Sequence, residues 1–241
     1  MSEQIDFLLD NIPNLLIGFP GHRPGGLLMS IILAAVAIGL GFLLAIVIAA
    51  GHESRRRPVR LAAHFYVQVF RGIPLILLLL IVHQLLRYGR FVGLSSSPLL
   101  SALVTLTLYS SAYQTQIVRA GLSSVPQRMV EAARLMGSNQ SQAYRLIKLR
   151  YTLHVMFPAF TGQAISLFKD TSVVVILGVA ELMTVARIAL GGDVGNAPFW
   201  MGLYLVVGLF YFLVAFTLSH LARSWERTHR IGDLTHSLVS Y

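Results

Sequence analysis

The chain has 241 residues, of which 55% are hydrophobic and 12% are charged, and its formal net charge is +9 at pH 7. Because soluble domains usually carry about 25% charged residues, this composition excludes an ordinary soluble protein and predicts an all-α membrane protein. The chain contains no cysteine, which excludes disulfides and thiolate metal sites.

The first 25 residues precede the first long apolar run and form a predicted N-terminal segment, 1–25, on the outer side of the membrane. Its apolar residues recur roughly on one helical stripe, and the segment lacks the basic start of a cleavable signal peptide, so no cleavage is expected. The stripe consists of Ile5, Leu8, Leu9, Ile12, Leu15 and Leu16. An amphipathic helix at the membrane interface and an ordered tail packed on the helix bundle both fit this pattern.

Three long runs without a charged residue or histidine follow, and each is long enough to cross a membrane as a helix. Two further stretches are apolar but contain histidines, Arg71 or Pro158. Together they predict about five transmembrane helices within a domain at 26–225, near 27–50, 61–86, 98–119, 151–168 and 197–220. A helix break is expected at Gly72-Ile73-Pro74. Residues 171–180 are too few to cross, so they predict a short helix or re-entrant piece inside the bundle.

The basic residues predict which side faces the cytoplasm. The connections on one side of the five predicted spans hold thirteen Lys and Arg residues, and those on the other side hold four. The positive-inside rule therefore places the N-terminus outside and a tail at 226–241 in the cytoplasm. This distribution explains the positive charge without a nucleic-acid partner.

The most polar long stretch is the predicted cytoplasmic loop 122–150. Pro126 suits the first turn of a helix that reaches Met136, Gly137 suits a left-handed C-cap, and Ser138 can cap a second helix. We therefore expect a helix–turn–helix elbow. Its expected exposed stripe, suited to a groove on another protein, is Met129, Val130, Ala133 and Met136. A generic amphipathic loop is the alternative.

Several motifs of this chain resemble those of the ABC importer permeases of the polar amino acid uptake family. "EAARLMG" (131–137), followed by "YRLIKL" (144–149), is similar to the EAA loop of that family. The stretches "FYVQVFRGIPLILLLL" (65–80), "SAYQTQIVRAGLSSVPQRMVEAARLMG" (111–137) and "GQAISLFKDTSVVVILGVAELM" (162–183) resemble that family too. The resemblance covers roughly residues 26–230. It implies a type I ABC importer permease fold with a cytoplasmic coupling-helix loop, in the inner (plasma) membrane of a bacterial cell.

The resemblance also implies a function. The chain would be the permease subunit of an ATP-binding cassette importer that moves polar amino acids into the cytoplasm by alternating access. It would not itself be an enzyme or bind a cofactor, and it lacks a GxxxxGK[ST] phosphate loop, so ATP and Mg would reside on a partner. The implied partners are a cytoplasmic ABC ATPase dimer, a second permease subunit (identical or paralogous), a periplasmic amino-acid-binding protein and membrane lipid, with no nucleic acid.

An ion-coupled secondary transporter or channel without an ATPase is the alternative from another class. Such proteins often show inverted repeats or paired broken helices, which five predicted spans do not display. The elbow would also have no evident purpose in such a protein.

Within the loop, the resemblance implies that Glu131 meets a basic or polar group of the ATPase. Ala132 and Ala133 would permit close approach, and Gly137 would make the turn. Met129 and Arg134 complete the predicted ATPase-coupling set. The loop departs from the family pattern at Arg150, which replaces a proline. Because Arg150 keeps its N–H, the helix can continue there, which leaves the angle of the fourth span open.

Polar residues within the predicted spans are the candidates for a substrate path. Tyr109, Tyr113 and Gln116 share one helical face, and Ser110 and Gln114 share the adjacent one. Together with Gln163 and Ser166 they form the predicted path, with polar packing between helices as the alternative.

Three charged residues complete the predictions. Arg71 is either a gate near the path or a side chain that reaches the cytoplasmic headgroups. Lys169 and Asp170 either form an internal ion pair or line the path. No HxxH or HExxH spacing occurs, so no metal is predicted.

Overall fold

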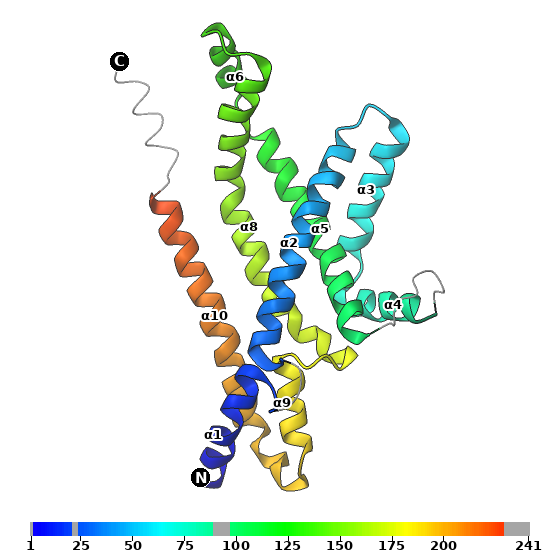
Figure 1. The fold of residues 1–241 in the computed structure, drawn as a ribbon, viewed down its shortest axis with the longest axis vertical. Helices are drawn as coiled ribbons and strands as arrows, with labels where there is room; N and C mark the ends of the chain where they lie inside the picture. Colours follow the sequence, from blue (N-terminus) through cyan, green and yellow to red (C-terminus); the bar gives the residue numbers. More distant parts are fainter. Residues whose placement is uncertain (1, 21–23, 89–96, 229–241) are drawn as a thin grey trace.

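The computed structural model describes residues 2–20, 24–88 and 97–228, and most of these lie in helices (Figure 1). The predicted tail from residue 229 onward, and Arg23 and Arg90 of the charge count, lie outside the described residues. The helices in chain order are α1 (Ser2–Ile17), α2 (Gly26–His52), α3 (Arg57–Gly72), α4 (Leu75–Tyr88), α5 (Pro98–Ser123), α6 (Gln127–Leu135), α7 (Gln140–Ala143), the π-helix η1 (Tyr144–Leu149), α8 (Arg150–Asp170), the 3₁₀-helix η2 (Thr171–Leu177), α9 (Leu182–Gly191), the 3₁₀-helix η3 (Val194–Phe199) and α10 (Trp200–Thr228).

Helix α5 is the centre of the bundle and packs against α2, α3, α4 and α8. Most side chains on its buried face are small or polar, including Ser101, Thr105, Ser110 and Thr115. The facing side of α2 is also small, and a Cβ added at Gly41 would lie 3.3 Å from Ser110. Small residues let helix backbones approach closely, which is how helices associate in a membrane.

The structure divides the predicted span at 61–86 into two helices, α3 and α4. The chain bends by 114° between them. Ile73 has an extended backbone (φ −94°, ψ 132°), because the residue before a proline disfavours helical geometry and Pro74 lacks an N–H. The helix break expected at Gly72-Ile73-Pro74 is therefore present, and α4 runs in a different direction from α3.

By length and composition, the described residues contain three helices able to cross a membrane, or four if the bent pair counts as one. The three are residues 26–52, 140–177 and 195–228. Helix α5 has 26 residues and is long enough to cross, but it is too polar to meet the same test. The predicted number of about five transmembrane helices is therefore only approximate.

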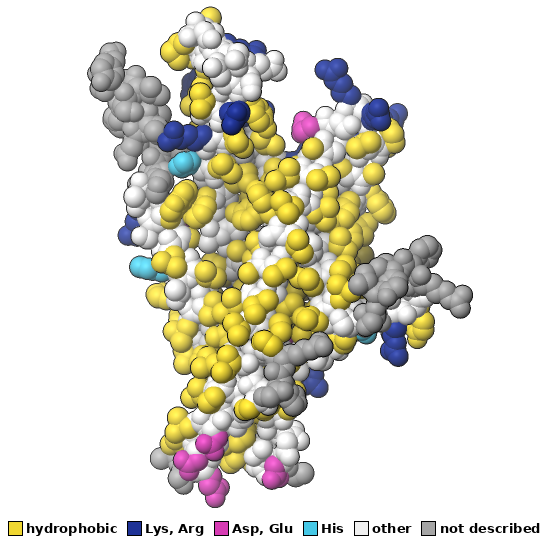
Figure 2. All heavy atoms as spheres, viewed as in Figure 1, with side chains coloured by type: hydrophobic (Ala, Val, Ile, Leu, Met, Phe, Trp, Pro, Cys, Tyr) yellow, Lys and Arg dark blue, Asp and Glu magenta, His cyan; other side chains and the backbone are white. Residues whose placement is uncertain are grey.

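The two ends of the molecule differ in charge, as Figure 2 shows. Basic side chains gather at the end that carries α6 and the α2–α3 turn, whereas acidic side chains gather at the end of α1 and α9. Helix α1 packs on α2, α9 and α10, and Leu15 is fully buried there with Leu182 and Leu203. Of the two alternatives for the N-terminal segment 1–25, the structure therefore shows the one in which the segment packs on the helix bundle.

The predicted short piece at 171–180 is the helix η2, with Thr171 and Val174 fully buried. It ends at Gly178, whose backbone is left-handed (φ 73°), a conformation that glycine adopts without steric cost. The short helix inside the bundle is therefore confirmed.

Candidate functional site

The predicted elbow is present at the basic end of the molecule (Figure 1). Helix α6 ends at Leu135, and Gly137 is left-handed with φ 87°. The Gly137 N–H donates to the Arg134 carbonyl (3.0 Å), and the Ser138 N–H donates to the Ala133 carbonyl (3.0 Å). These two bonds close the end of the helix in the way a left-handed glycine permits, so the predicted C-cap is confirmed.

The second helix begins one residue later than predicted. Asn139, not Ser138, is its N-cap: Asn139 Oδ1 accepts from the Gln142 N–H, and Gln142 Oε1 accepts from the Asn139 N–H, both at 2.9 Å. This reciprocal pair is a capping box. The Ser138 prediction was wrong because the backbone of Ser138 still closes the preceding helix.

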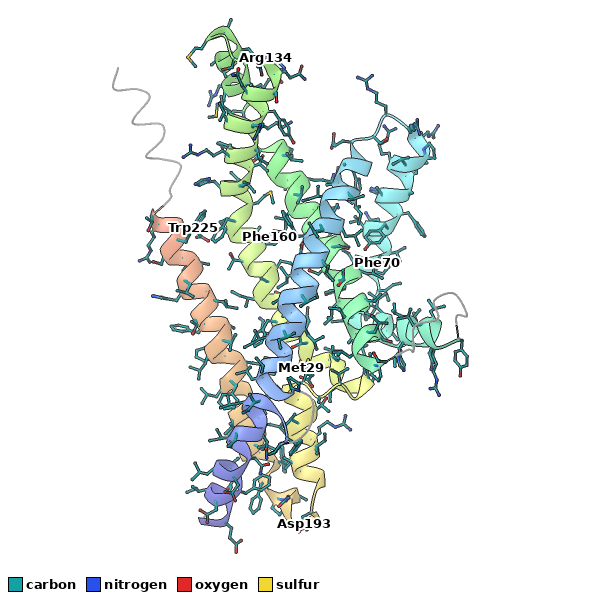
Figure 3. The ribbon with its side chains drawn as sticks, viewed as in Figure 1. Met29, Phe70, Arg134, Phe160, Asp193 and Trp225 are labelled. Carbon is teal, nitrogen blue, oxygen red and sulfur yellow. The ribbon has the colours of Figure 1, made fainter. Side chains whose placement is uncertain are left out.

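The faces of α6 also differ from the prediction. Ala133 is 2% exposed, and Ala143 on α7, which packs against α6, is 1% exposed. The predicted exposed stripe is therefore corrected, because its central alanine lies on the inner side of the elbow. The outward residues are Arg128, Glu131, Ala132, Arg134, Leu135 and Met136, while Met129 and Val130 are half-buried. Leu135 and Met136 are 89% and 80% exposed, respectively. Figure 3 labels Arg134 on the elbow.

The elbow continues into the membrane domain as one helix. Helix α7, η1 and α8 form an unbroken run, and the Arg150 N–H donates to the Ile147 carbonyl. The expected continuation at Arg150 is confirmed. The stretch Tyr144–Leu149 is π-helical, a rare form that is frequent at functional sites.

At the base of the elbow, α5 and α8 lie in close contact. Thr152 Oγ1 donates to the Gly121 carbonyl (3.2 Å), and a Cβ added at Gly121 would overlap the Met156 side chain. A larger residue there would force Met156 to move, so the two helices that flank the elbow are closely packed as a pair.

A polar cluster lies where α3 ends beside α5. The Arg71 guanidinium carbon lies 5.1 Å from the centre of the Tyr113 ring, within range of a cation–π contact. The Tyr113 and Tyr109 rings are 4.9 Å apart, and the Tyr109 hydroxyl donates to the Tyr113 hydroxyl over 3.5 Å. Half-buried Asp170, the last residue of α8, is an electrostatic neighbour of Tyr109. The cluster thus offers a cation, two hydroxyls and a carboxylate.

The other predicted path residues are placed differently. Ser110 and Gln114 are fully buried, and Gln114 Nε2 donates to Ser110 Oγ (2.7 Å) and to the Ile38 carbonyl of α2 (3.3 Å). Ser110 and Gln114 therefore fit the alternative interpretation, which is polar packing between helices. Gln116 and Gln163 are half-buried and Ser166 is exposed. In the described part of the chain, no hydrogen bond joins these three side chains to the tyrosines.

Lys169 and Asp170 are adjacent in sequence, but their side chains differ in exposure. Lys169 is exposed and Asp170 is half-buried. Within residues 97–228, Lys169 and Asp170 are electrostatic neighbours rather than a hydrogen-bonded pair. Asp170 thus has both Lys169 and Tyr109 as electrostatic neighbours.

A search against protein-family models matches residues 37–227 to the binding-protein-dependent transport system inner membrane component family. The chain belongs to this family. Its apolar helices and this family membership identify it as a multi-pass membrane protein.

Several relatives of this chain are named as amino-acid transport proteins. It is 30% identical over 216 residues to the inner membrane amino-acid ABC transporter permease protein YhdY of Escherichia coli (strain K12), which covers 88% of this chain and 58% of YhdY. It is 32% identical over 207 residues to the glutamate/aspartate import permease protein GltK of Escherichia coli O6:H1, covering 84% of this chain and 91% of GltK. The chain thus spans little more than half the length of YhdY.

A solved structure confirms the expected type I ABC importer permease fold. The structure titled "Crystal structure of an amino acid ABC transporter with histidines" matches with a TM-score of 0.74 and 25% identity, over 95% of this chain and 97% of that one.

One buried group of the chain was not predicted from the sequence. Glu181 is fully buried, and its carboxylate accepts hydrogen bonds from the Met183 N–H (2.9 Å), the Thr184 N–H (2.7 Å), the Thr184 hydroxyl (3.0 Å) and the Tyr211 hydroxyl (3.1 Å). It caps α9 and ties it to α10. The only signal in the sequence is a lone carboxylate in the apolar stretch "GVAELM".

The same junction is tied to α2. The Leu182 N–H donates to Ser30 Oγ (3.2 Å), and the Gly26 N–H donates to the Ala180 carbonyl (2.9 Å). Three helices therefore meet through polar contacts at the end of the molecule opposite the elbow.

Proposed function

We propose that this chain is the permease subunit of an ATP-binding cassette importer for polar amino acids, driven through its elbow by a cytoplasmic ATPase. The observation that carries the proposal is the elbow itself: a short helix, fixed from behind by Ala133 and Ala143, that presents Glu131, Leu135 and Met136 to solvent. A charged residue beside two long apolar side chains suits a cleft on a partner protein.

The elbow can pass a movement into the membrane domain. Helix α8 follows it without a break and has 21 residues, which corresponds to about 30 Å. Its far end carries Asp170, beside the polar cluster. Closure of an ATPase dimer on two elbows would therefore tilt α8 and α5 together and alternate the access of the cluster between the two sides.

The polar cluster is the part of this permease that we assign to the substrate. Arg71 can form a paired, charge-assisted contact with a carboxylate, and Asp170 can accept from an ammonium group. The two tyrosine hydroxyls supply neutral hydrogen-bonding groups between these charges. A free amino acid carries both of these charges, and the related permeases YhdY and GltK are named for amino-acid substrates.

The remaining partners follow from this assignment. The importer would contain the ATPase dimer with its ATP and Mg, a second permease subunit (identical or paralogous) and a periplasmic amino-acid-binding protein. The basic end of the molecule would face the cytoplasm and α1 the outside. Purification of the chain with its ATPase, followed by identification of the subunits that accompany it, tests this composition.

The charge reversal Glu131→Lys tests the elbow. We expect it to abolish ATP-dependent uptake of amino acids into proteoliposomes while the protein still inserts into the membrane, because the reversed charge would repel a basic partner group. Glu53→Lys is the matched control, since Glu53 is also exposed at the basic end but lies outside the elbow.

Uptake at the normal rate in Glu131→Lys would remove the elbow from the mechanism. Uptake by the wild-type chain without any ATPase would instead favour an ion-coupled transporter.

A further inference from the structure

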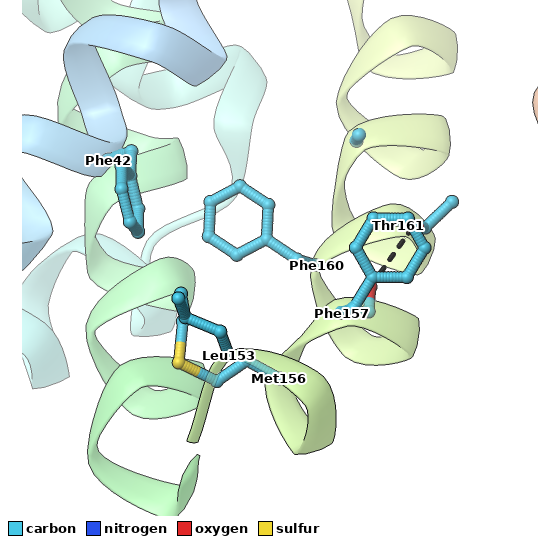
Figure 4. A pocket seen from close by; sticks show the side chains of 7 residues that line it. Phe42, Leu153, Met156, Phe157, Phe160 and Thr161 are labelled. Atoms are coloured by element: carbon cyan, nitrogen blue, oxygen red, sulfur yellow. Dashed lines mark hydrogen bonds between the residues drawn. The ribbon is translucent and has the colours of Figure 1, made fainter. Parts of the chain in front are cut away.

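An apolar groove runs along the elbow-side half of α8 (Figure 4). It has a volume of about 280 Å³ and is lined by Phe42 of α2 and, on α8, by Leu153, Met156, Phe157, Phe160 and Ala164. Thr161 also lines it, but its hydroxyl donates to the Phe157 carbonyl (3.0 Å) and is therefore already paired. The groove thus offers its occupant hydrocarbon and aromatic surface.

The shape of the groove follows the helix. Its α8 residues recur at intervals of three or four from Leu153 to Ala164, so they form one stripe about 16 Å long, parallel to the helix axis. Helix α2, which supplies Phe42, also carries exposed apolar side chains, among them Leu43 (62% exposed) and Val47 (67% exposed). Figure 2 shows the broad apolar surface of the bundle. In a membrane, such a surface is in contact with acyl chains.

Basic and aromatic residues lie at the elbow end of the groove. Exposed Arg150 precedes Leu153 by three residues, which places it one turn farther toward the elbow on the same stripe. Trp225 of α10 packs on Phe157, with ring centres 3.9 Å apart. Tryptophan is enriched where a membrane meets water, so this end is at the depth of the lipid headgroups.

We propose that this groove binds one acyl chain of an anionic phospholipid whose phosphate is held by Arg150. The apolar stripe matches a hydrocarbon chain that lies along the membrane normal, and the guanidinium at its end matches a phosphate. The lipid would lie against α8, the helix that joins the elbow to Asp170, so the anionic lipid content of the membrane would influence the moving part of the transporter.

The tryptophans of the chain provide a direct test. The chain contains two, so Trp200→Phe leaves Trp225 as the single reporter beside the groove. The variant chain is reconstituted into phosphatidylcholine nanodiscs with a small fraction of lipid, either phosphatidylglycerol or phosphatidylcholine, that is brominated on one acyl chain close to the headgroup. Bromine quenches tryptophan fluorescence on contact. We expect occupancy by the anionic lipid to be about fivefold higher, as one basic residue at a membrane surface would give.

Two variants test the two halves of the site. Arg150→Gln removes the partner of the phosphate, and Ala164→Phe fills the groove; both should abolish the preference for phosphatidylglycerol. The control for Arg150→Gln is Arg60→Gln on α3. The control for Ala164→Phe is Ala159→Phe, because Ala159 is exposed on α8 outside the groove. Both control variants should retain the preference for phosphatidylglycerol. Retention of the preference in either test variant overturns the proposal. Equal quenching by the two lipids overturns it in favour of bulk lipid contact, and no quenching by either overturns it in favour of a second copy of the chain covering the groove.

Discussion

Arg71 is the residue on which the proposed substrate cluster most depends. It stacks over Tyr113 and supplies the only cation among the cluster residues Arg71, Tyr109, Tyr113 and Asp170. A hydrogen bond to a charged group contributes about 1.5–3 kcal/mol. We therefore expect Arg71→Gln to raise the KM for amino-acid uptake by about 10-fold to 100-fold, and Arg71→Lys to raise it less.

Transport kinetics in proteoliposomes measure this effect, and Arg57→Gln, at the opposite end of α3, is the control. An unchanged KM in Arg71→Gln would mean that the cation–π contact is structural and that the substrate binds elsewhere.

Glu181 makes a different kind of contribution, to stability. All four groups that approach its carboxylate donate hydrogen bonds. In Glu181→Gln, the amide NH₂ would face at least one of these donors, which leaves a buried group unpaired at a cost of about 1–3 kcal/mol. Tyr211→Phe removes one donor only and should cost less, about 0.5–1.5 kcal/mol.

Thermal unfolding of the detergent-solubilised protein should therefore rank wild type above Tyr211→Phe and Tyr211→Phe above Glu181→Gln. A wild-type melting temperature for Glu181→Gln would show that the junction does not limit stability.

The contrast between these sites explains what the sequence could predict about single residues. The elbow is local: Gly137 and its hydrogen-bond partners lie within a few positions of one another, so the motif predicts their arrangement. Glu181 is paired with Tyr211, 30 residues away, and Leu182 is paired with Ser30, 152 residues away. Contacts of that separation depend on the whole bundle, and no spacing rule indicates them.

At the scale of elements, the crossing of α5 and α8 below the elbow is a close contact at Gly121. The Cβ of an alanine at position 121 would overlap Met156 Cγ, and overpacking of this kind costs about 1–3 kcal/mol. We expect Gly121→Ala to lower the melting temperature and to uncouple ATP hydrolysis from uptake, because the two helices that flank the elbow would be forced apart.

Gly162→Ala on α8 is the matched control. No heavy atom lies within 4 Å of a Cβ at this position, so the alanine should be neutral or raise stability through its higher helix propensity. Equal behaviour of the two variants would contradict the close packing of α5 on α8.

The helices themselves were predicted with uneven success, for physical reasons. Apolar runs identify α2 and α10 because their surfaces face hydrocarbon. Helix α5 was found from its lack of charge, although its buried face is polar. The break before Pro74 follows from covalent geometry, but the 114° bend depends on how α4 packs on α5 and η2, which the sequence of the segment alone does not encode.

At the scale of the whole molecule, the separation of charge along the long axis predicts how the permease lies in the membrane. The natural chain has no cysteine, so single cysteines can be introduced without a background. Ser141→Cys on α7 and Glu3→Cys on α1 are both at exposed positions at opposite ends.

In the absence of the ATPase, we expect a membrane-impermeant maleimide to label Ser141→Cys only in inverted vesicles and Glu3→Cys only in intact cells, because basic segments stay in the cytoplasm. Labelling of Ser141→Cys in intact cells would reverse the orientation and separate the elbow from any cytoplasmic ATPase.

The π-helical stretch Tyr144–Leu149 gives the link between elbow and membrane a property that a plain α-helix would lack. A π-turn holds one more residue than an α-turn, and one residue corresponds to about 100° around an α-helical axis. Rewinding the surplus residue would swivel the elbow by about a quarter of a revolution around α8 without interrupting the rod between them. Deletion of one residue from this stretch would therefore restore α-helical geometry there, whereas a deletion in the capped helix α6 would displace its Gly137 turn.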